Sequence, residues 1–197
     1  MDGNYSQTKV LPVITYREIL SEDAAMLLRW RNTPRVAAGF SGTLPPDVDR
    51  QKRWIESSRL AEDSYHWITV SDNHDFGYVR FHHWNKEERS CRLGFYVGEE
   101  AFALCYVTVL DDLLSFLFYR LGLDYVVSYV LTDNRHSNRF NVAYGFTRRP
   151  DMDDVATQSA GKATFAYTLS REDWIRLRHI MECEADFPVT FWSASPY

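Results

Sequence analysis

The chain has 197 residues, of which 45% are hydrophobic and 25% are charged, with nine Gly and seven Pro. These values are ordinary for a globular protein and argue against a disordered chain, a collagen-like repeat or a disulfide scaffold. The 22 basic and 27 acidic side chains give a formal net charge of −5, which argues against a chain built as a whole to bind nucleic acid.

The cysteine spacing and the hydropathy of the chain indicate in which cellular compartment the protein is expected. Cys91, Cys105 and Cys183 are widely spaced and odd in number, so neither a disulfide framework nor a metal site is predicted. The longest apolar stretch, residues 102–110, is shorter than the ~20 residues that a membrane helix needs. Residues 1–9 are polar and contain no apolar signal core. We therefore expect a cytoplasmic protein without a membrane span or a bound metal.

The first half of the chain predicts one strand, two helices and then a group of strands. Residues 13–19 are β-branched, aromatic and partly alternating, which indicates a strand. Ser21 and the acids after it are typical of a helix start, and residues 47–60 predict a second helix. Three strand-like runs follow at 66–70, 76–81 and 91–97. Turn-type residues separate these runs, which predicts an antiparallel meander.

The second half alternates helices and strands. The strongly apolar segment 107–121 predicts a helix that Gly122 ends. The nearly continuous apolar run 125–131 predicts a buried strand, parallel to the one before it because a helical crossover connects them. The remaining elements are a short helix at 137–144, a strand at 164–169 and a closing helix from Ser170. We expect one mixed α/β domain over residues 1–197, with peripheral tails at 1–12 and 185–197.

Two junctions suggest a ligand site. The strand 91–97 runs out at Tyr96, Val97 and Gly98 and leads directly into the long helix, whose first N–H groups suit a phosphate. The next strand is followed by Asn134 and a second helix start. A cleft between the carboxyl ends of these strands could hold an extended phosphate-bearing cofactor, although most such junctions bind nothing.

The order of the elements carries a family resemblance. Together with Asn134-x-x-Ser137, which leads to Tyr144-Gly145-Phe146, it resembles the GNAT acyl-CoA-dependent N-acyltransferases over residues 13–175. Residues 165–174 resemble the ribosomal-protein N-acetyltransferase branch, and residues 28–34 resemble the branch that acetylates nucleotide-linked amino sugars. The resemblance implies a mixed sheet of about six to seven strands, with helices on both faces and a splayed strand pair at the cofactor cleft.

The resemblance implies acetyl-CoA or another short acyl-CoA as co-substrate. The residues that it assigns to the co-substrate are Tyr96, Val97, Gly98, Ala103, Leu104, Cys105, Tyr106, Val107, Thr108, Asn134, Ser137, Asn138 and Arg139. The chain departs from the family where the glycines of the phosphate loop are replaced by Ala103, Cys105 and Val107. No Lys or Arg lies between Leu93 and Tyr119, so positive charge must come from elsewhere.

The resemblance also implies direct attack of a neutral amine on the thioester in a ternary complex. A backbone N–H near Val97 or Gly98 would stabilise the thioester oxygen. The candidate base is His82 or His83; adjacent strand residues face opposite sides, so only one can face the cleft, and two surface histidines are the alternative. The family's acid position holds Asn141, and Tyr144 is a second candidate, with a packed core Tyr as the alternative.

The end of the first helix and the loop after it are the expected acceptor region. The candidate residues are Trp30, Arg31, Asn32 and Phe40. An Arg can bind a diphosphate and an aromatic ring can stack on a base or sugar, whereas Trp30 is better explained as a core residue. We expect a small-molecule primary amine, with a nucleotide-linked amino sugar first. A protein N-terminus, another small amine, a non-catalytic binding module and a homodimer stay open.

Overall fold

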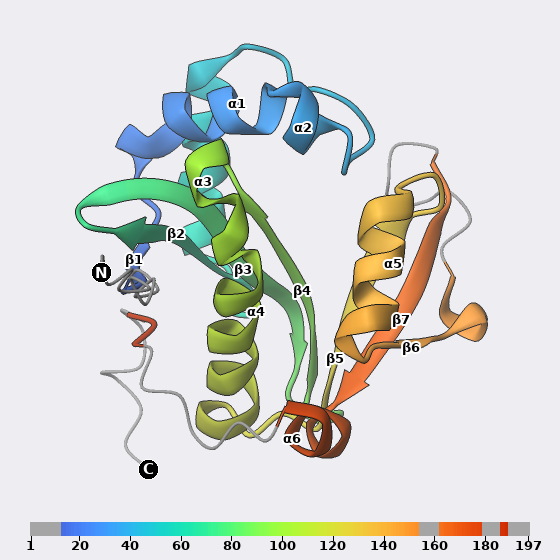
Figure 1. Cartoon of the computed structure of the whole chain (residues 1–197). Coiled ribbons are helices and arrows are strands. Elements are labelled where there is room, and N and C mark those ends of the chain that lie inside the picture. The colour runs from blue at the N-terminus through green and yellow to red at the C-terminus, as the bar shows by residue number, and fades with distance from the viewer. Residues whose placement is uncertain (1–12, 154–161, 179–185, 189–197) are drawn as a thin grey trace, which may run out of the picture.

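A mixed seven-stranded sheet in the order β1-β2-β3-β4-β5-β7-β6 forms the centre of the structure (Figure 1). The computed structural model describes residues 13–153, 162–178 and 186–188. The strands are β1 (Thr15–Glu18), β2 (Tyr65–Ser71), β3 (His74–Asn85), β4 (Ser90–Val97), β5 (Tyr125–Leu131), β6 (Thr147–Arg148) and β7 (Thr164–Ser170). The helices are α1 (Ala24–Asn32), α2 (Pro34–Ala37), α3 (Val48–Arg59), α4 (Tyr106–Ser115), α5 (Arg135–Tyr144) and α6 (Arg171–Arg178). Short 3₁₀ helices lie at Ser21–Asp23, Glu100–Cys105 and Pro150–Met152, and Phe116–Arg120 is a π-helical turn.

The observed order of elements confirms the order predicted from the sequence. β2, β3 and β4 form the expected antiparallel meander, and β5 lies parallel to β4 after a helical crossover. The predicted mixed α/β fold, with its splayed strand pair, is therefore confirmed. The expected tail at 1–12 lies outside the described residues. Within the expected tail at 185–197, Phe187 is buried and stacks on Tyr16 with ring centroids 3.9 Å apart.

Alternate residues of the sheet face two different sets of helices. On the face covered by α1 and α3, Leu27, Ile55 and Ile68 are buried together. On the opposite face, Trp67 is buried in a larger cluster that includes Leu113 of α4. Figure 1 shows α4 and α5 side by side on this second face. The predicted covering of both faces is thus observed, and it separates the two sides of the site described below.

The helical segment after β4 is longer than predicted. It begins as a 3₁₀ helix at Glu100 rather than at residue 107. Glu100–Arg120 spans 21 residues with a mean hydropathy of 1.8, so by length and composition alone it could cross a membrane. Half of the most apolar stretch of this segment is buried, and Val109, Leu113 and Leu117 lie in the core. Packing against the sheet therefore accounts for the apolar character of this segment.

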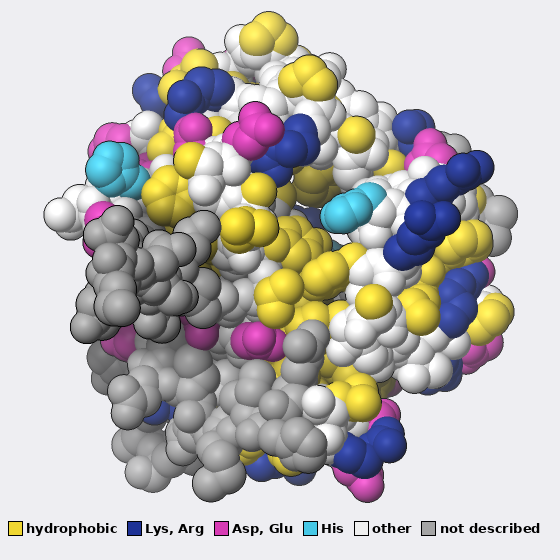
Figure 2. All heavy atoms as spheres, viewed as in Figure 1, with side chains coloured by type: hydrophobic (Ala, Val, Ile, Leu, Met, Phe, Trp, Pro, Cys, Tyr) yellow, Lys and Arg dark blue, Asp and Glu magenta, His cyan; other side chains and the backbone are white. Residues whose placement is uncertain are grey.

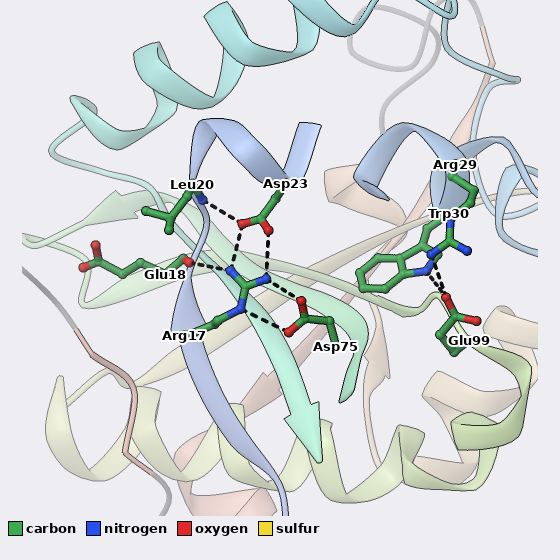
Figure 3. Close-up of polar contacts among 8 residues, drawn as sticks. All are labelled: Arg17, Glu18, Leu20, Asp23, Arg29, Trp30, Asp75 and Glu99. Atoms are coloured by element: carbon green, nitrogen blue, oxygen red, sulfur yellow. Dashed lines mark hydrogen bonds and ion pairs between the residues drawn. The ribbon is translucent and has the colours of Figure 1, made fainter. Parts of the chain in front are cut away.

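Arg17 joins the edge strand β1 to two other parts of the chain (Figure 3). Its guanidinium donates to both oxygens of Asp23, just before α1, at 2.8 Å, and to Asp75 of β3 at 3.1 and 2.6 Å. Asp23 also accepts a hydrogen bond from the Leu20 amide at 2.8 Å. Hydrogen bonds to Asp23 and then to Asp75 raise the pKa of Arg17 above its usual range, although burial opposes them. The network fixes the point at which α1 leaves the sheet.

The turn after β4 is packed against the end of α1. Trp30 lies so close to Gly98 that a Cβ added there would be 2.3 Å from the indole ring. Glu99 accepts hydrogen bonds from Trp30 Nε1 at 2.5 Å and from Arg29 Nη2 at 3.0 Å (Figure 3). The amides of Gly98 and Glu99 both donate to the Phe76 carbonyl, at 2.7 and 2.9 Å. Helix α1 and the β4–α4 turn are therefore one connected unit.

We expect Gly98→Ala to lower the free energy of unfolding by about 1–3 kcal/mol, because Trp30 is fully enclosed and cannot move away from a new methyl group. Urea unfolding measures the difference. Gly39→Ala is the matched control, since its Cβ would meet its nearest neighbour at an ordinary 3.4 Å. Equal losses in the two variants would contradict the packing described for Gly98.

Candidate functional site

The site is organised by a gap between β4 and β5. The two strands pair over three residues each: Ser90 with Tyr125, Cys91 with Val126 and Arg92 with Val127. Beyond Arg92 and Val127 this pairing stops, while β4 remains paired with β3 as far as Val97 and β5 remains paired with β7 over its whole length. Each strand is thus held from its outer side, and the gap between them (hereafter the wedge) is built into the sheet.

The wedge edge of β4 carries backbone groups that can bind a ligand. Hydrogen bonding alternates along an antiparallel pair, and the Gly98 amide bonds to Phe76 on the β3 side. Leu93, Phe95 and Val97 therefore direct their backbone groups toward the wedge. The amides of Val97 and Gly98 were the two expected donors to the thioester oxygen. The Gly98 amide is already hydrogen-bonded to β3, whereas the Val97 amide faces the wedge.

The start of α4 differs from the predicted phosphate loop. The positions that replace the family's glycines lie within continuous helix, so their amides bond to carbonyls earlier in the same helix. Ala103, Leu104 and Val107 are exposed, Cys105 is buried and Thr108 is half-buried. Residues 103–107 are therefore helical rather than an open loop, and their assignment to the co-substrate stays a prediction. The free amides lie at the true helix start, which carries the acid Glu100.

Tyr96 and Tyr106 lie on opposite sides of the sheet. Tyr96 belongs to the α1 side, where its ring lies near Phe40 and Tyr78. Tyr106 contacts Phe95 of β4 and Phe140 of α5, with ring centroids 4.3 and 4.8 Å apart. Figure 2 shows hydrophobic side chains along the furrow between α4 and α5, with Lys and Arg side chains on the α5 side.

The polar residues at the start of α5 mainly hold the helix in place. Asn134 accepts a hydrogen bond from the Ser137 amide at 3.1 Å and caps α5. Asn138 donates to the Leu131 carbonyl at 3.0 Å and accepts from Tyr167 at 2.9 Å. These side chains are therefore positioned by the fold. Arg135 and Arg139 are exposed on the same helix, and neither forms an ion pair with another described residue.

Two cavities open on the α1 face of the sheet. The helix-side cavity has a volume of about 340 Å³ and is lined by Leu27, Leu28, Arg31, Phe40, Leu44, Pro45, Asp47, Arg50, Gln51, Trp54, Tyr78, Arg80, Gly94, Phe95 and Tyr96. The wedge cavity has a volume of about 260 Å³ and is lined by Gly39, Phe40, Ser41, Arg80, His82, Arg92, Leu93, Gly94, Tyr129, Leu131 and Thr164. Phe40, Arg80 and Gly94 line both cavities, so the two spaces adjoin at the wedge.

The structure divides the predicted acceptor residues into two groups. Arg31 and Phe40 line the helix-side cavity, with the Arg31 guanidinium 3.7 Å from the centre of the Phe40 ring. Asn32 instead holds the loop that closes this cavity, donating to the Leu44 carbonyl at 3.0 Å and accepting from the Leu44 amide at 2.7 Å. Trp30 lines neither cavity and lies in the core, in agreement with the interpretation that the sequence favoured for this residue.

Only His82 of the histidine pair faces a cavity. His82 lines the wedge cavity, while His83 is exposed at a register shift and has a φ of +54°. Burial, followed by the charge of Arg80 and smaller contributions that include Arg92, lowers the pKa of His82 to about 2. His82 is therefore neutral, as an amine-deprotonating base must be at the outset, but its surroundings oppose holding a proton.

The two candidate proton donors on α5 lie away from the cavities. Asn141 is buried and donates to the Ser128 hydroxyl of β5 at 3.1 Å. Tyr144 is buried, donates to Asp111 of α4 and accepts from Trp174 Nε1 at 3.4 Å. Both side chains connect α5 to its neighbours. The structure does not bring either one together with His82.

A buried chain of polar side chains that was not predicted from the sequence lies beside the helix-side cavity. Tyr78 lines the cavity, and its hydroxyl lies 2.5 Å from His66 Nδ1. His66 Nε2 lies 2.6 Å from the Ser64 hydroxyl. Burial and then the charge of Arg80 lower the pKa of His66 to about 3, while burial raises the pKa of Tyr78 to about 12. The spacing of Tyr78, Arg80 and His82 along one strand was the available signal, since alternate residues share a face.

The low pKa of His66 predicts a pH-dependent stability. Between pH 6.5 and about 3 the unfolded chain binds a proton that the folded chain excludes, so stability falls as the pH falls. For His66 alone this loss is roughly 2 kcal/mol between pH 7 and pH 5. Urea unfolding of the wild type and of His66→Gln at both pH values measures it. The free energy of unfolding of His66→Gln should fall less between pH 7 and pH 5 than that of the wild type. Equal decreases in the two proteins would contradict the low pKa of His66.

The comparisons with known proteins agree with this architecture. A family model described as the acetyltransferase (GNAT) domain matches residues 14–147. Comparison with curated proteins finds no match. Spermidine N-acetyltransferase from Vibrio cholerae, solved in complex with CoA and spermine, has a TM-score of 0.69 and 12% identity, covering 82% of this chain and 98% of that one. A structure from T. thermophilus, named for acetyltransferase activity, has a TM-score of 0.65 and 18% identity, covering 84% and 90% of the two chains. At these identities the likeness shows the fold.

Proposed function

The chain belongs to the acetyltransferase (GNAT) family, and from this premise we propose that it transfers an acetyl or other short acyl group from acyl-CoA to a primary amine of a small molecule in the cytoplasm. The observation that carries the proposal is the wedge. It opens between an apolar furrow on the α4 face and two adjoining cavities on the α1 face. Two reactants can thus meet from opposite sides of one sheet.

The furrow and the wedge fit the thioester arm of acyl-CoA. The arm is narrow and contains amide groups, which suit the backbone of Phe95 and the Val97 amide on β4, beyond the point where pairing with β5 stops. The Val97 carbonyl already accepts a hydrogen bond from Arg35 Nη2 at 2.8 Å. The start of α4 offers no cationic side chain to the diphosphate, so Arg135 and Arg139 on α5 are the better candidates. When bound, the co-substrate supplies an activated acyl group.

The residues on the α1 face would hold and prepare the amine. The two cavities position it beside Gly94, at the point where β4 and β5 separate, and such positioning supplies much of the acceleration in a direct transfer. The Val97 amide can donate to the carbonyl oxygen as negative charge develops there. His82 can accept the proton that the amine loses.

For the acceptor, we propose a nucleotide-linked amino sugar first, since Arg31 can pair with a diphosphate and Phe40 can stack on a ring. The spermidine N-acetyltransferase from Vibrio cholerae suggests a polyamine as an alternative. The 3₁₀ helix Glu100–Cys105, in which Ala103 and Cys105 replace the family's glycines, favours a second candidate function, a non-catalytic binding module.

We expect acetyl-CoA to stabilise the protein by about 2.7 kcal/mol at 100 times its dissociation constant. A thermal-shift titration with acetyl-CoA, a longer acyl-CoA and free CoA measures this effect. Release of free thiol in the presence of an amine then separates a transferase from a binding module. Absence of both a shift and thiol release would contradict the proposed function.

His82→Ala and His83→Ala should differ in their effect on turnover. We expect His82→Ala to lower kcat by about 10²-fold, because it removes the base that lines the wedge cavity, whereas His83→Ala should retain the wild-type rate. The rate of thiol release with the best amine from a panel of glucosamine, spermidine and tyramine measures both variants. Equal rates in the two variants would remove His82 from the reaction.

A further inference from the structure

Arg80 of β3 stands where the two cavities meet. It lines both of them and is half-buried. Among the described residues, no ion pair with a carboxylate involves Arg80. Across the sheet Arg80 is paired with Gly94, whose added Cβ would lie 3.3 Å from Arg80 Nε, and on its own strand Arg80 is hydrogen-bonded to the Tyr78 hydroxyl. Burying part of a guanidinium without an anionic partner carries a desolvation penalty, and binding of an anion would offset that penalty.

Most of the other charged groups of the cavities are also positive. Arg31 and Arg50 line the helix-side cavity, and Arg92 lines the wedge cavity. Asp47 is the one carboxylate among the described residues that line either cavity, and it already accepts a hydrogen bond from the Arg50 amide at 2.8 Å. The cavities therefore carry an excess of positive charge in a chain whose net charge is −5.

The remaining lining is largely aromatic and apolar. Phe40, Trp54, Tyr78 and Tyr96 surround the helix-side cavity. Trp54 packs edge-on against His66, and Tyr78 and Tyr96 lie side by side with ring centroids 5.2 Å apart. Such walls bind the flat or apolar body of a ligand, while the arginines bind a charged group attached to it.

We propose that the amine acceptor carries an anionic group, a carboxylate or a phosphate, which binds Arg80 at the junction of the two cavities. The inference rests on the proposed function and narrows its acceptor. A polyamine would bring further positive charge to Arg31, Arg50, Arg80 and Arg92, so the cavities select against it. The bound anion would also offset the charges of Arg80 and Arg92, two of the causes that lower the pKa of His82.

Calorimetry with matched pairs of amines tests the proposal without acyl-CoA. Glucosamine and glucosamine 6-phosphate differ by a phosphate, tyramine and tyrosine differ by a carboxylate, and spermidine is the polycation. We expect the anionic member of at least one pair to bind about tenfold tighter than its partner, and tighter than spermidine. The pair that shows the preference identifies the anion as phosphate or carboxylate.

Variants assign the preference to Arg80. Arg80→Gln should abolish it and Arg80→Lys should retain part of it, since Lys keeps the charge without the planar guanidinium. Arg53→Gln is the matched control, because Arg53 is exposed on α3 and lines neither cavity. Equal binding within both pairs, tighter binding of spermidine, no binding of any probe, or a preference that survives in Arg80→Gln would overturn the proposal. A failure of acyl transfer is seen separately, in thiol release.

Discussion

The separation of β4 from β5 is the constraint on which the rest of the site depends. Two adjacent parallel strands can separate only if each remains hydrogen-bonded to another strand, since an unpaired strand edge loses hydrogen bonds. Here β3 secures β4 as far as Val97, and β7 secures all of β5. The Arg92–Val127 pair marks the point where the pairing stops. The sheet thereby keeps an opening through its centre without giving up either strand.

The opening connects two faces of the sheet whose side chains differ in chemical character. The furrow between α4 and α5 is apolar, which suits a long flexible arm (Figure 2). The opposite face is cationic and aromatic, with Arg80 at the centre of two adjoining cavities. The helices differ accordingly: α4 contributes Leu113 and Leu114 to the core, whereas α1 and α3 contribute Arg31 and Arg50 to a cavity wall. One sheet thus presents different chemistry to each reactant.

Local patterns in the sequence were enough to predict the order of the elements, including the parallel strand 125–131. Arg31 and Phe40 were predicted to contact the acceptor and do line a cavity, but Arg80 and Gly94 were not predicted, because they come from separate strands and meet only through the sheet register. The start of α4 was predicted to within one residue, but the 3₁₀ helix Glu100–Cys105 before it was missed, because the family's loop was carried over to residues that are compatible with helix. The core position of Trp30 was the favoured interpretation from the sequence, but its contact with Gly98 could not be predicted, because the two residues meet only in the fold.

The carboxylate of Glu99 links the two faces mechanically. It belongs to the turn that leads into α4, yet it holds Trp30 and Arg29 of α1, the helix that also supplies Arg31 to the cavity wall (Figure 3). A shift of that turn on one side of the sheet would therefore be transmitted to the opposite side through Glu99, together with the contact between Trp30 and Gly98. Occupancy of the furrow would then change the shape of the helix-side cavity.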